Sequence, residues 1–149
     1  MPLTIIPDVI NDQTLRCLGA EATALDAARK MAEYDISAIM VVADKDNLVG
    51  IVTERDITRR IVADGSDAGE TLLGQIMTKD PETVAPGDSA RYALRLMQAV
   101  KCRHLPVVED GRVMGVVSMR DLRTSIAVKT YAGDKDLVTR ILAKSGGSA

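Results

Sequence analysis

The sequence is poor in aromatic residues and in histidine. It has no Trp and no Phe, and its aromatic side chains are Tyr34, Tyr92 and Tyr131. A bound base would therefore be held by aliphatic side chains and backbone, and single-stranded nucleic acid would lack its usual stacking platform. Because His104 is the single histidine, one chain cannot build a catalytic histidine pair or a multi-histidine zinc site, so no metal site is predicted.

Cysteines and long apolar runs are also scarce. Cys17 and Cys102 are isolated thiols with no CxxC spacing, which is typical of buried, reduced cysteines. The longest apolar run, residues 38–43, is far shorter than the roughly 20 residues of a membrane span. The N-terminus has no basic segment leading into an apolar core. We therefore expect a cytoplasmic protein that does not associate with membranes.

The charge balance excludes a strong positive field. Nineteen Lys and Arg against 21 Asp and Glu give a net charge of −2 over 149 residues. This balance does not favour nucleic acid or an anionic membrane as partner. With 46% hydrophobic and 27% charged residues, the chain has the composition of an ordinary globular protein with one domain or two small ones.

The sequence contains an internal duplication. With an offset of 66 residues, Ala24 aligns with Ala90 and Met31 with Met97. After one loop residue is dropped, residues 50–57 (GIVTERDI) align with 115–122 (GVVSMRDL) with four identities in eight positions. Two copies of one structural unit explain this pattern better than coincidence.

Each copy predicts a β-α-β-β-α unit, so the fold class is α/β (α+β). Helical periodicity covers 24–34 and 90–101, capped by Thr23 and by Asp88 or Ser89. Hairpins follow, and second helices begin near Arg55 and Arg120. The hairpin strands are 37–42 with 48–53 and 104–108 with 112–118, and the opening strands lie near 15–18 and 82–84.

The predicted organisation is two repeats that pack on each other. Repeat 1 covers residues 1–63 and repeat 2 covers residues 71–128, with a polar linker at residues 64–70 between them. A tail follows at residues 129–149, with a short helix over residues 135–144. A unit of about 60 residues is marginal alone, so the two repeats gain stability by packing together.

The segments 53–56 (TERD) and 118–121 (SMRD) lie where a strand passes into a helix, and two interpretations apply. The first is a capping box, in which hydroxyl and carboxylate satisfy the first helical amides. The second is a nucleotide site, in which amides and an arginine hold phosphate and the carboxylate accepts ribose hydroxyls. The residues alone leave both open, and one structure can satisfy both.

The doubled Gly-x-x-Thr/Ser-x-Arg-Asp motif, behind hairpins such as 103–108 (RHLPVV), resembles the cystathionine β-synthase (CBS) domain. Further matching segments are 8–10 (DVI), 77–78 (MT) and 83–86 (TVAP). The resemblance covers residues 3 to 128 and indicates a stand-alone tandem pair, called a Bateman module. It implies pseudo-twofold packing, with two clefts between the repeats that hold AMP, ADP, ATP or another adenosine compound.

The resemblance also implies roles for individual residues. Asp56 and Asp121 would bind ribose hydroxyls, and Thr53 and Ser118 would lie near the first phosphate. The remaining ligand-binding candidates are the two motif arginines, the opening-strand residues and the residues that begin the hairpins: Arg55, Arg120, Cys17, Thr83, Val84, Ser37, Arg103, His104 and Pro106. Leu18, Ala38 and Met40 occupy the corresponding positions of the first repeat.

The two repeats differ where a phosphate would arrive. The first has Ser37 and Ala38 where the second has Arg103 and His104, so tighter phosphate binding is expected in the second. Without the resemblance, a strand-end histidine is favoured over a phosphate ligand as the explanation of His104. Arg59 and Arg60 are explained either by a solvated helix face or by contact with a long phosphate tail.

The leading hypothesis is a non-catalytic regulatory homodimer that binds an adenine nucleotide, needs no cofactor and signals to an unidentified partner. The alternatives are a ligand-free structural dimerisation module, a regulator that binds S-adenosylmethionine or NAD, and an enzyme such as a nucleotide hydrolase. The enzyme hypothesis lacks a convincing pair of nucleophile and base. Helical faces at 24–32 and 90–97 were the surfaces expected to remain for dimerisation.

Overall fold

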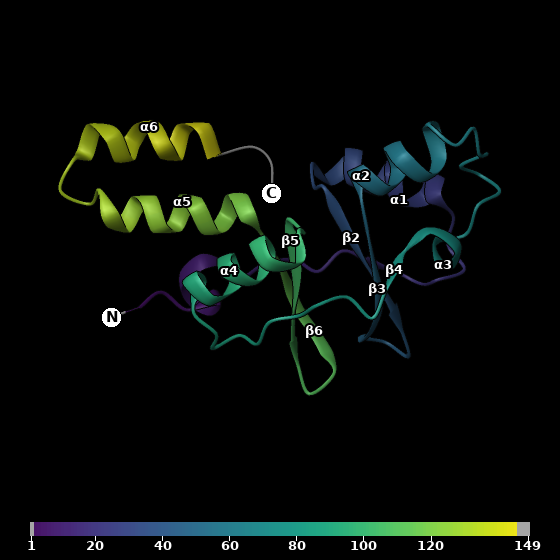
Figure 1. Cartoon of the computed structure of the whole chain (residues 1–149), viewed down its shortest axis with the longest axis horizontal. Helices are drawn as coiled ribbons and strands as arrows, with labels where there is room; N and C mark the ends of the chain where they lie inside the picture. Colours follow the sequence, from purple (N-terminus) through teal and green to yellow (C-terminus); the bar gives the residue numbers. More distant parts are fainter. Residues whose placement is uncertain (1, 146–149) are drawn as a thin grey trace. The chain divides into compact units, whose positions relative to one another are not determined.

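A computed structural model describes residues 2–145, which form two compact units. The first-repeat unit consists of residues 15–82 and 110–113. The second-repeat unit consists of residues 2–14, 83–109 and 114–145. Each unit has its own pair of central strands and its own helices (Figure 1), and each has its own apolar core. The mixed α and β fold class is therefore confirmed.

The segment that leads into each repeat packs with the other repeat. The turn η1 (Ile5–Val9) and Ile10 lie near the start of the predicted first repeat, but Ile5 and Ile10 are buried in the core of the second-repeat unit. Helix α3 (Leu73–Ile76) lies near the start of the predicted second repeat, but its buried residues lie in the core of the first-repeat unit. Apolar burial thus divides the chain differently from the sequence-based boundaries of 1–63 and 71–128, since neither repeat fills its core with its own leading segment.

The first-repeat unit is built on an antiparallel pair of strands. Strand β2 (Ala38–Ala43) pairs with β3 (Asn47–Thr53), with a register shift at Val41/Val42. Strand β1 (Cys17–Leu18) adds in parallel to β2, and β4 (Thr78–Lys79) adds antiparallel to β3. Helix α1 (Ala24–Tyr34), the short α2 (Glu54–Asp56) and the wider helical turn η2 (Ile57–Val62) complete the unit.

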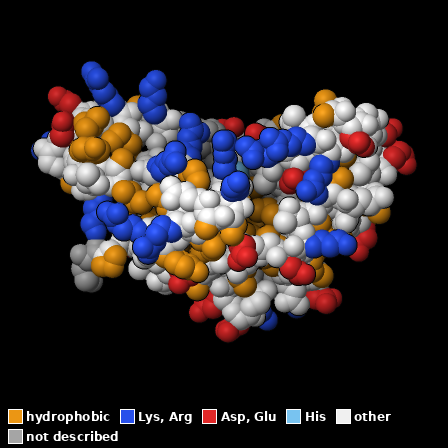
Figure 2. All heavy atoms as spheres, in the orientation of Figure 1, with side chains coloured by type: hydrophobic (Ala, Val, Ile, Leu, Met, Phe, Trp, Pro, Cys, Tyr) orange, Lys and Arg blue, Asp and Glu red, His pale blue; other side chains and the backbone are white. Residues whose placement is uncertain are grey.

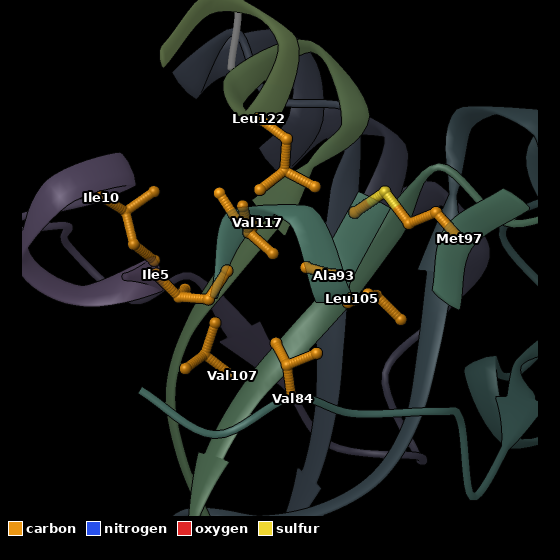
Figure 3. Close-up of a cluster of buried hydrophobic side chains, with 10 residues drawn as sticks. Ile5, Ile10, Val84, Ala93, Met97, Leu105, Val107, Val117 and Leu122 are labelled. Atoms are coloured by element: carbon orange, nitrogen blue, oxygen red, sulfur yellow. The ribbon is translucent and has the colours of Figure 1, made fainter. Parts of the chain in front are cut away.

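The second-repeat unit repeats this plan with a longer helix after its motif. Strands β5 (His104–Glu109) and β6 (Arg112–Ser118) pair, and Val84 forms an isolated parallel bridge with Val107 in place of a full opening strand. Helices α4 (Ala90–Val100) and α5 (Met119–Thr130) pack over a core that Figure 3 shows between Leu122, Met97 and Ile5. Helix α6 (Lys135–Ser145), predicted from the sequence as a short tail helix, lies beside α5 (Figure 1).

Equivalent helices α1 and α4 bury equivalent residues. Thr23 caps α1 in a full capping box with Asp26, and the Ser89 side chain accepts from the Tyr92 amide at the start of α4. The apolar residues Ala24, Ala27, Met31, Ala90, Ala93 and Met97 are all buried within their own units. Most of the apolar face of each helix is therefore covered within its own unit, whereas Tyr92 of α4 stays exposed.

The glycine that begins each motif allows another chain segment to approach its strand closely. A Cβ on Gly50 would collide with the Met77 side chain and lie 3.0 Å from the Thr78 carbonyl oxygen. A Cβ on Gly115 would lie 2.7 Å from Gln13 Oε1 and 2.9 Å from Ile10 Cδ1. These close approaches explain why the duplicated motif starts with glycine in both copies.

Candidate functional site

The first motif copy is a capping box at the end of β3. The backbone amide of Thr53 donates to Asp56 Oδ2 at 2.8 Å, and the Thr53 hydroxyl donates to the same oxygen at 3.2 Å. In return, the Asp56 amide donates to Thr53 Oγ1 at 3.4 Å. The capping interpretation of this motif is therefore confirmed.

The second motif copy has the same geometry at the end of β6. The Ser118 amide donates to Asp121 Oδ2 at 3.0 Å, and the Asp121 amide donates to Ser118 Oγ at 3.0 Å. Ser118 is buried, with 6% of its surface exposed, and begins the 12-residue helix α5. A carboxylate has about four lone-pair positions, so capping leaves acceptor capacity for a ligand.

Both motifs are held against the start of the preceding strand. The Glu54 amide donates to the Ser37 carbonyl at 3.0 Å, and the Met119 amide donates to the Arg103 carbonyl at 2.8 Å. These two bonds are equivalent in the duplication. They bring Ser37 beside the first motif and Arg103 beside the second, as the aligned sequence positions require.

The opening segments reach the same strands from the other side. Cys17 is in register with Met40, and Leu18 with Val41. In the second-repeat unit the Val84 amide donates to the Pro106 carbonyl at 3.0 Å, and the Val84 carbonyl accepts from Val108 at 2.8 Å. Since the backbone N–H of Val84 is used inside the unit, the exposed Thr83 is the candidate of this pair with the better access to a ligand.

His104 is largely buried beside the second motif. Burial lowers the pKa of its imidazole, and Arg103 acts in the same direction, while the carboxylate of Asp121 opposes both. The neutral imidazole can both donate and accept a hydrogen bond. His104, Arg103 and Asp121 therefore form one electrostatically coupled group.

The first-repeat unit has a different group at the corresponding positions. Ala38 replaces His104, and Cys17 replaces Thr83. Burial raises the pKa of the Cys17 thiol, with Asp46 acting in the same direction and Lys30 opposing, so this thiol stays protonated and is a poor nucleophile. The motif arginines Arg55 and Arg120 are both exposed.

One side chain near the motifs, Gln13, was not singled out from the sequence, and the contacts of a second, Arg60, were not predicted. Gln13 donates to the Val116 carbonyl at 3.1 Å and accepts from the Val116 amide at 2.9 Å, which ties residues 103 positions apart. Arg60 Nε lies 3.7 Å from Asp56 Oδ1, and Arg60 Nη1 donates to the Ile76 carbonyl at 2.6 Å. The i,i+4 spacing of Asp56 and Arg60 could have indicated the ion pair between these two side chains.

Within residues 2–145, no helix is long and apolar enough to cross a membrane. The same part of the chain contains no group of three or more His, Cys, Asp or Glu side chains placed to hold a metal ion.

Comparison with known families matches the chain twice. The model of the CBS domain matches residues 6–63 and residues 73–128. A protein of Methanopyrus kandleri described as uncharacterized is 36% identical over 101 residues, which are 67% of this chain and 52% of that protein. The chain spans about half the length of the first curated relatives it matches.

Solved structures match over most of the chain. A protein with CBS domains from Burkholderia ambifaria is 32% identical, with a TM-score of 0.74 over 87% of this chain and 95% of that chain. The CBS domain protein PAE2072 from Pyrobaculum aerophilum is 28% identical, with a TM-score of 0.73 over 81% and 92% of the two chains. The latter structure is a complex with AMP.

Proposed function

This chain belongs to the CBS-domain family as a tandem pair, and we propose that it is a regulatory module that binds an adenine nucleotide. The observation that carries the proposal is the AMP complex of the Pyrobaculum relative, which matches most of this chain. The second motif supplies the chemistry such a ligand needs. We therefore take AMP, ADP or ATP as the ligand class.

In this proposal Asp121 accepts hydrogen bonds from the ribose. Its Oδ2 holds the Ser118 amide at 3.0 Å, and the lone pairs that capping does not use accept the two ribose hydroxyls. Arg103 and Arg120 provide the charge-assisted hydrogen bonds that a phosphate requires. Asp56, Thr53 and Arg55 are the equivalent ligands in the first repeat.

The adenine edge is recognised by backbone groups near Thr83. Because Val84 uses its N–H on Pro106, the preceding residue Thr83 is the better source of free backbone polar groups. Backbone donors and acceptors have fixed positions, so guanine, with a different edge, binds less well. His104 adds a neutral donor or acceptor beside the phosphate.

Calorimetric titration of the whole chain with AMP, ADP, ATP, GMP, S-adenosylmethionine and NAD tests the proposal. We expect adenine nucleotides to bind and to raise the melting temperature, since a ligand at 100 times its Kd stabilises the folded state by about 2.7 kcal/mol. Equal binding of AMP and GMP contradicts adenine recognition. Binding of no compound would favour a structural dimerisation module, and release of product from ATP and magnesium would favour an enzyme.

Asp121→Ala separates ligand binding from helix capping. Loss of two hydrogen bonds to a charged acceptor should weaken AMP binding by up to about 3–6 kcal/mol, while loss of the cap costs about 1 kcal/mol of stability. Asp26→Ala is the matched control, because Asp26 makes the same capping box with Thr23 at 3.0 and 3.1 Å outside the motif. The control should lose stability and keep AMP affinity. Equal AMP affinity in Asp121→Ala and Asp26→Ala would mean that Asp121 caps the helix and does not bind the ligand.

We further propose that the module forms a homodimer in the cytoplasm and acts on a partner protein. The apolar side chains that α4 leaves exposed are Tyr92 and Val100, with 45% and 42% of their surfaces accessible. Light scattering that finds a mass of 16.0 kDa at micromolar concentration would contradict the dimer. Comparison of the scattering mass with and without AMP would show whether the ligand changes the assembly.

A further inference from the structure

Asp56, the carboxylate of the first motif, is already engaged on both oxygens. Its Oδ2 accepts from the Thr53 amide and hydroxyl at 2.8 and 3.2 Å. Its Oδ1 lies 3.7 Å from Nε of Arg60, one helical turn further along the chain. The Asp56 side chain is 15% exposed, so this ion pair is shielded from water on the carboxylate side.

Arg60 is itself anchored at a second point. Its Nη1 donates a 2.6 Å hydrogen bond to the carbonyl of Ile76, the last residue of α3. The last carbonyls of a helix have no partner within the helix, and a guanidinium is a favoured partner for them. The two contacts hold the planar guanidinium between the motif carboxylate and the end of α3, although half of the Arg60 side chain is solvent-exposed.

The second motif has no counterpart of this arginine. The position equivalent to Arg60 in the duplication is Ser125, which carries no charge. Asp121 is electrostatically coupled to the imidazole of His104, on which Arg103 also acts. A ribose hydroxyl therefore meets a carboxylate with an arginine one helical turn further along the chain in the first motif, and a carboxylate with a serine at that position in the second.

We propose that Arg60 is a specificity-determining residue that occupies the first motif, so that an adenosine compound fills the second motif first. This inference rests on the proposed function. A ligand ribose must displace the guanidinium from Asp56 Oδ1 before it gains its own hydrogen bonds there. Exposed ion pairs at i,i+4 are weak, so we expect the occupation by Arg60 to reduce affinity about three- to tenfold, rather than to abolish binding.

The position of Arg60 in the sequence is also compatible with the opposite role, in which its side chain binds a phosphate and strengthens nucleotide binding. If its side chain turned toward a phosphate tail, its removal would weaken nucleotide binding. Adenosine has no phosphate, so it reports only on the competition for the carboxylate. Comparison of adenosine with AMP therefore distinguishes an occupying arginine from a phosphate ligand.

The test is calorimetry of the whole chain with adenosine and with AMP, in an Asp121→Ala background that leaves the first motif as the intact copy. Arg60→Gln removes the charge and keeps a donor for the Ile76 carbonyl. Arg59→Gln is the matched control, because it removes the same charge from the adjacent exposed residue. Melting curves confirm that each variant folds.

We expect Arg60→Gln to raise adenosine affinity about three- to tenfold, or to make it measurable, and Arg59→Gln to leave it unchanged. Unchanged adenosine binding in Arg60→Gln overturns the inference, as does an equal gain in Arg59→Gln. Weaker AMP binding with unchanged adenosine binding also overturns it and makes Arg60 a phosphate ligand. If the unmodified chain binds neither adenosine nor AMP, the proposed function itself fails. This outcome is distinguishable because it is measured without any of the variants.

Discussion

The two copies of the motif share their backbone geometry and differ in what surrounds the carboxylate. Both are capping boxes, and both are tied to the preceding strand by equivalent amide-to-carbonyl bonds from Glu54 and Met119. Asp56 lies 3.7 Å from Arg60, whereas Asp121 is electrostatically coupled to His104, on which Arg103 also acts. The comparison teaches that the duplicated motif preserves a helix cap, while the neighbours that decide ligand chemistry have diverged.

The two units also differ in net charge, and the second-repeat unit is the more positive. The first-repeat unit has nine Lys and Arg against fourteen Asp and Glu, and the second-repeat unit has ten against seven. Figure 2 shows Lys and Arg side chains gathered over the region of α5 and α6. The overall net charge of −2 hides this difference. An anionic ligand is therefore favoured electrostatically by the second-repeat unit.

The largest expected effect tests whether the two motif glycines are equivalent. Gly115→Ala should destabilise the fold by about 1–3 kcal/mol, because the new methyl meets Gln13 Oε1, which is fixed by its bonds to Val116. Gly50→Ala should cost less, because the Met77 side chain that it meets is flexible and the Thr78 carbonyl oxygen, at 3.0 Å, needs to move by only a few tenths of an ångström. Urea unfolding measures both.

Gly87→Ala is the control for these glycine variants, since a Cβ there meets nothing within 4 Å. We expect its free energy of unfolding to stay close to that of the unmodified chain. A smaller loss for Gly115→Ala than for Gly50→Ala would mean that Gln13 does not hold its segment against β6.

Much of this fold was predictable from the sequence, because it depends on local periodicity and capping. Helices α1 and α4 have the expected bounds to within a residue, and both hairpins and α6 form where the sequence predicts them. The Thr23 and Ser89 caps are also confirmed. The opening strand predicted near residues 82–84 is reduced to a single bridge at Val84, because no regular neighbour extends it.

The long-range contacts were not predictable, because they depend on where distant segments pack. Nothing in the local pattern places Ile5 in the core of the second-repeat unit, or joins Gln13 to Val116. The predicted site residues come together by repeat: Ser37 lies beside the first motif, and Arg103 and His104 lie beside the second. Their roles toward a ligand stay predictions.

The next effect sharpens the contrast between Arg103 and Ser37. Arg103→Ala should weaken AMP binding about ten- to a hundredfold and leave adenosine binding nearly unchanged, because a charge-assisted hydrogen bond contributes about 1.5–3 kcal/mol. Arg95→Ala, which removes the same charge from an exposed position of α4, is the control. Calorimetry that finds equal losses for AMP and adenosine would assign Arg103 a role in shaping the fold.

A smaller effect compares the two caps directly. Thr53→Ala and Ser118→Ala should each cost about 0.5–2 kcal/mol of stability, with Ser118→Ala the more costly. The amide-to-hydroxyl distance is 3.0 Å at Ser118 and 3.4 Å at Thr53, and Ser118 begins the longer helix. Thermal unfolding with Thr23→Ala as a reference cap measures the difference, and a larger loss at Thr53 would reverse the ranking.

The smallest expected effect tests the buried imidazole that distinguishes the second motif. Burial and Arg103 lower the pKa of His104, so the unfolded chain takes up a proton before the folded chain as the pH falls through the ordinary value of 6.5. Unfolding then binds a proton, and stability falls with pH below that value. His104→Asn should make the free energy of unfolding less dependent on pH in this window. Because the chain has no other histidine, the change in slope can be assigned to His104, and parallel curves for the two proteins would show that its protonation is not coupled to folding.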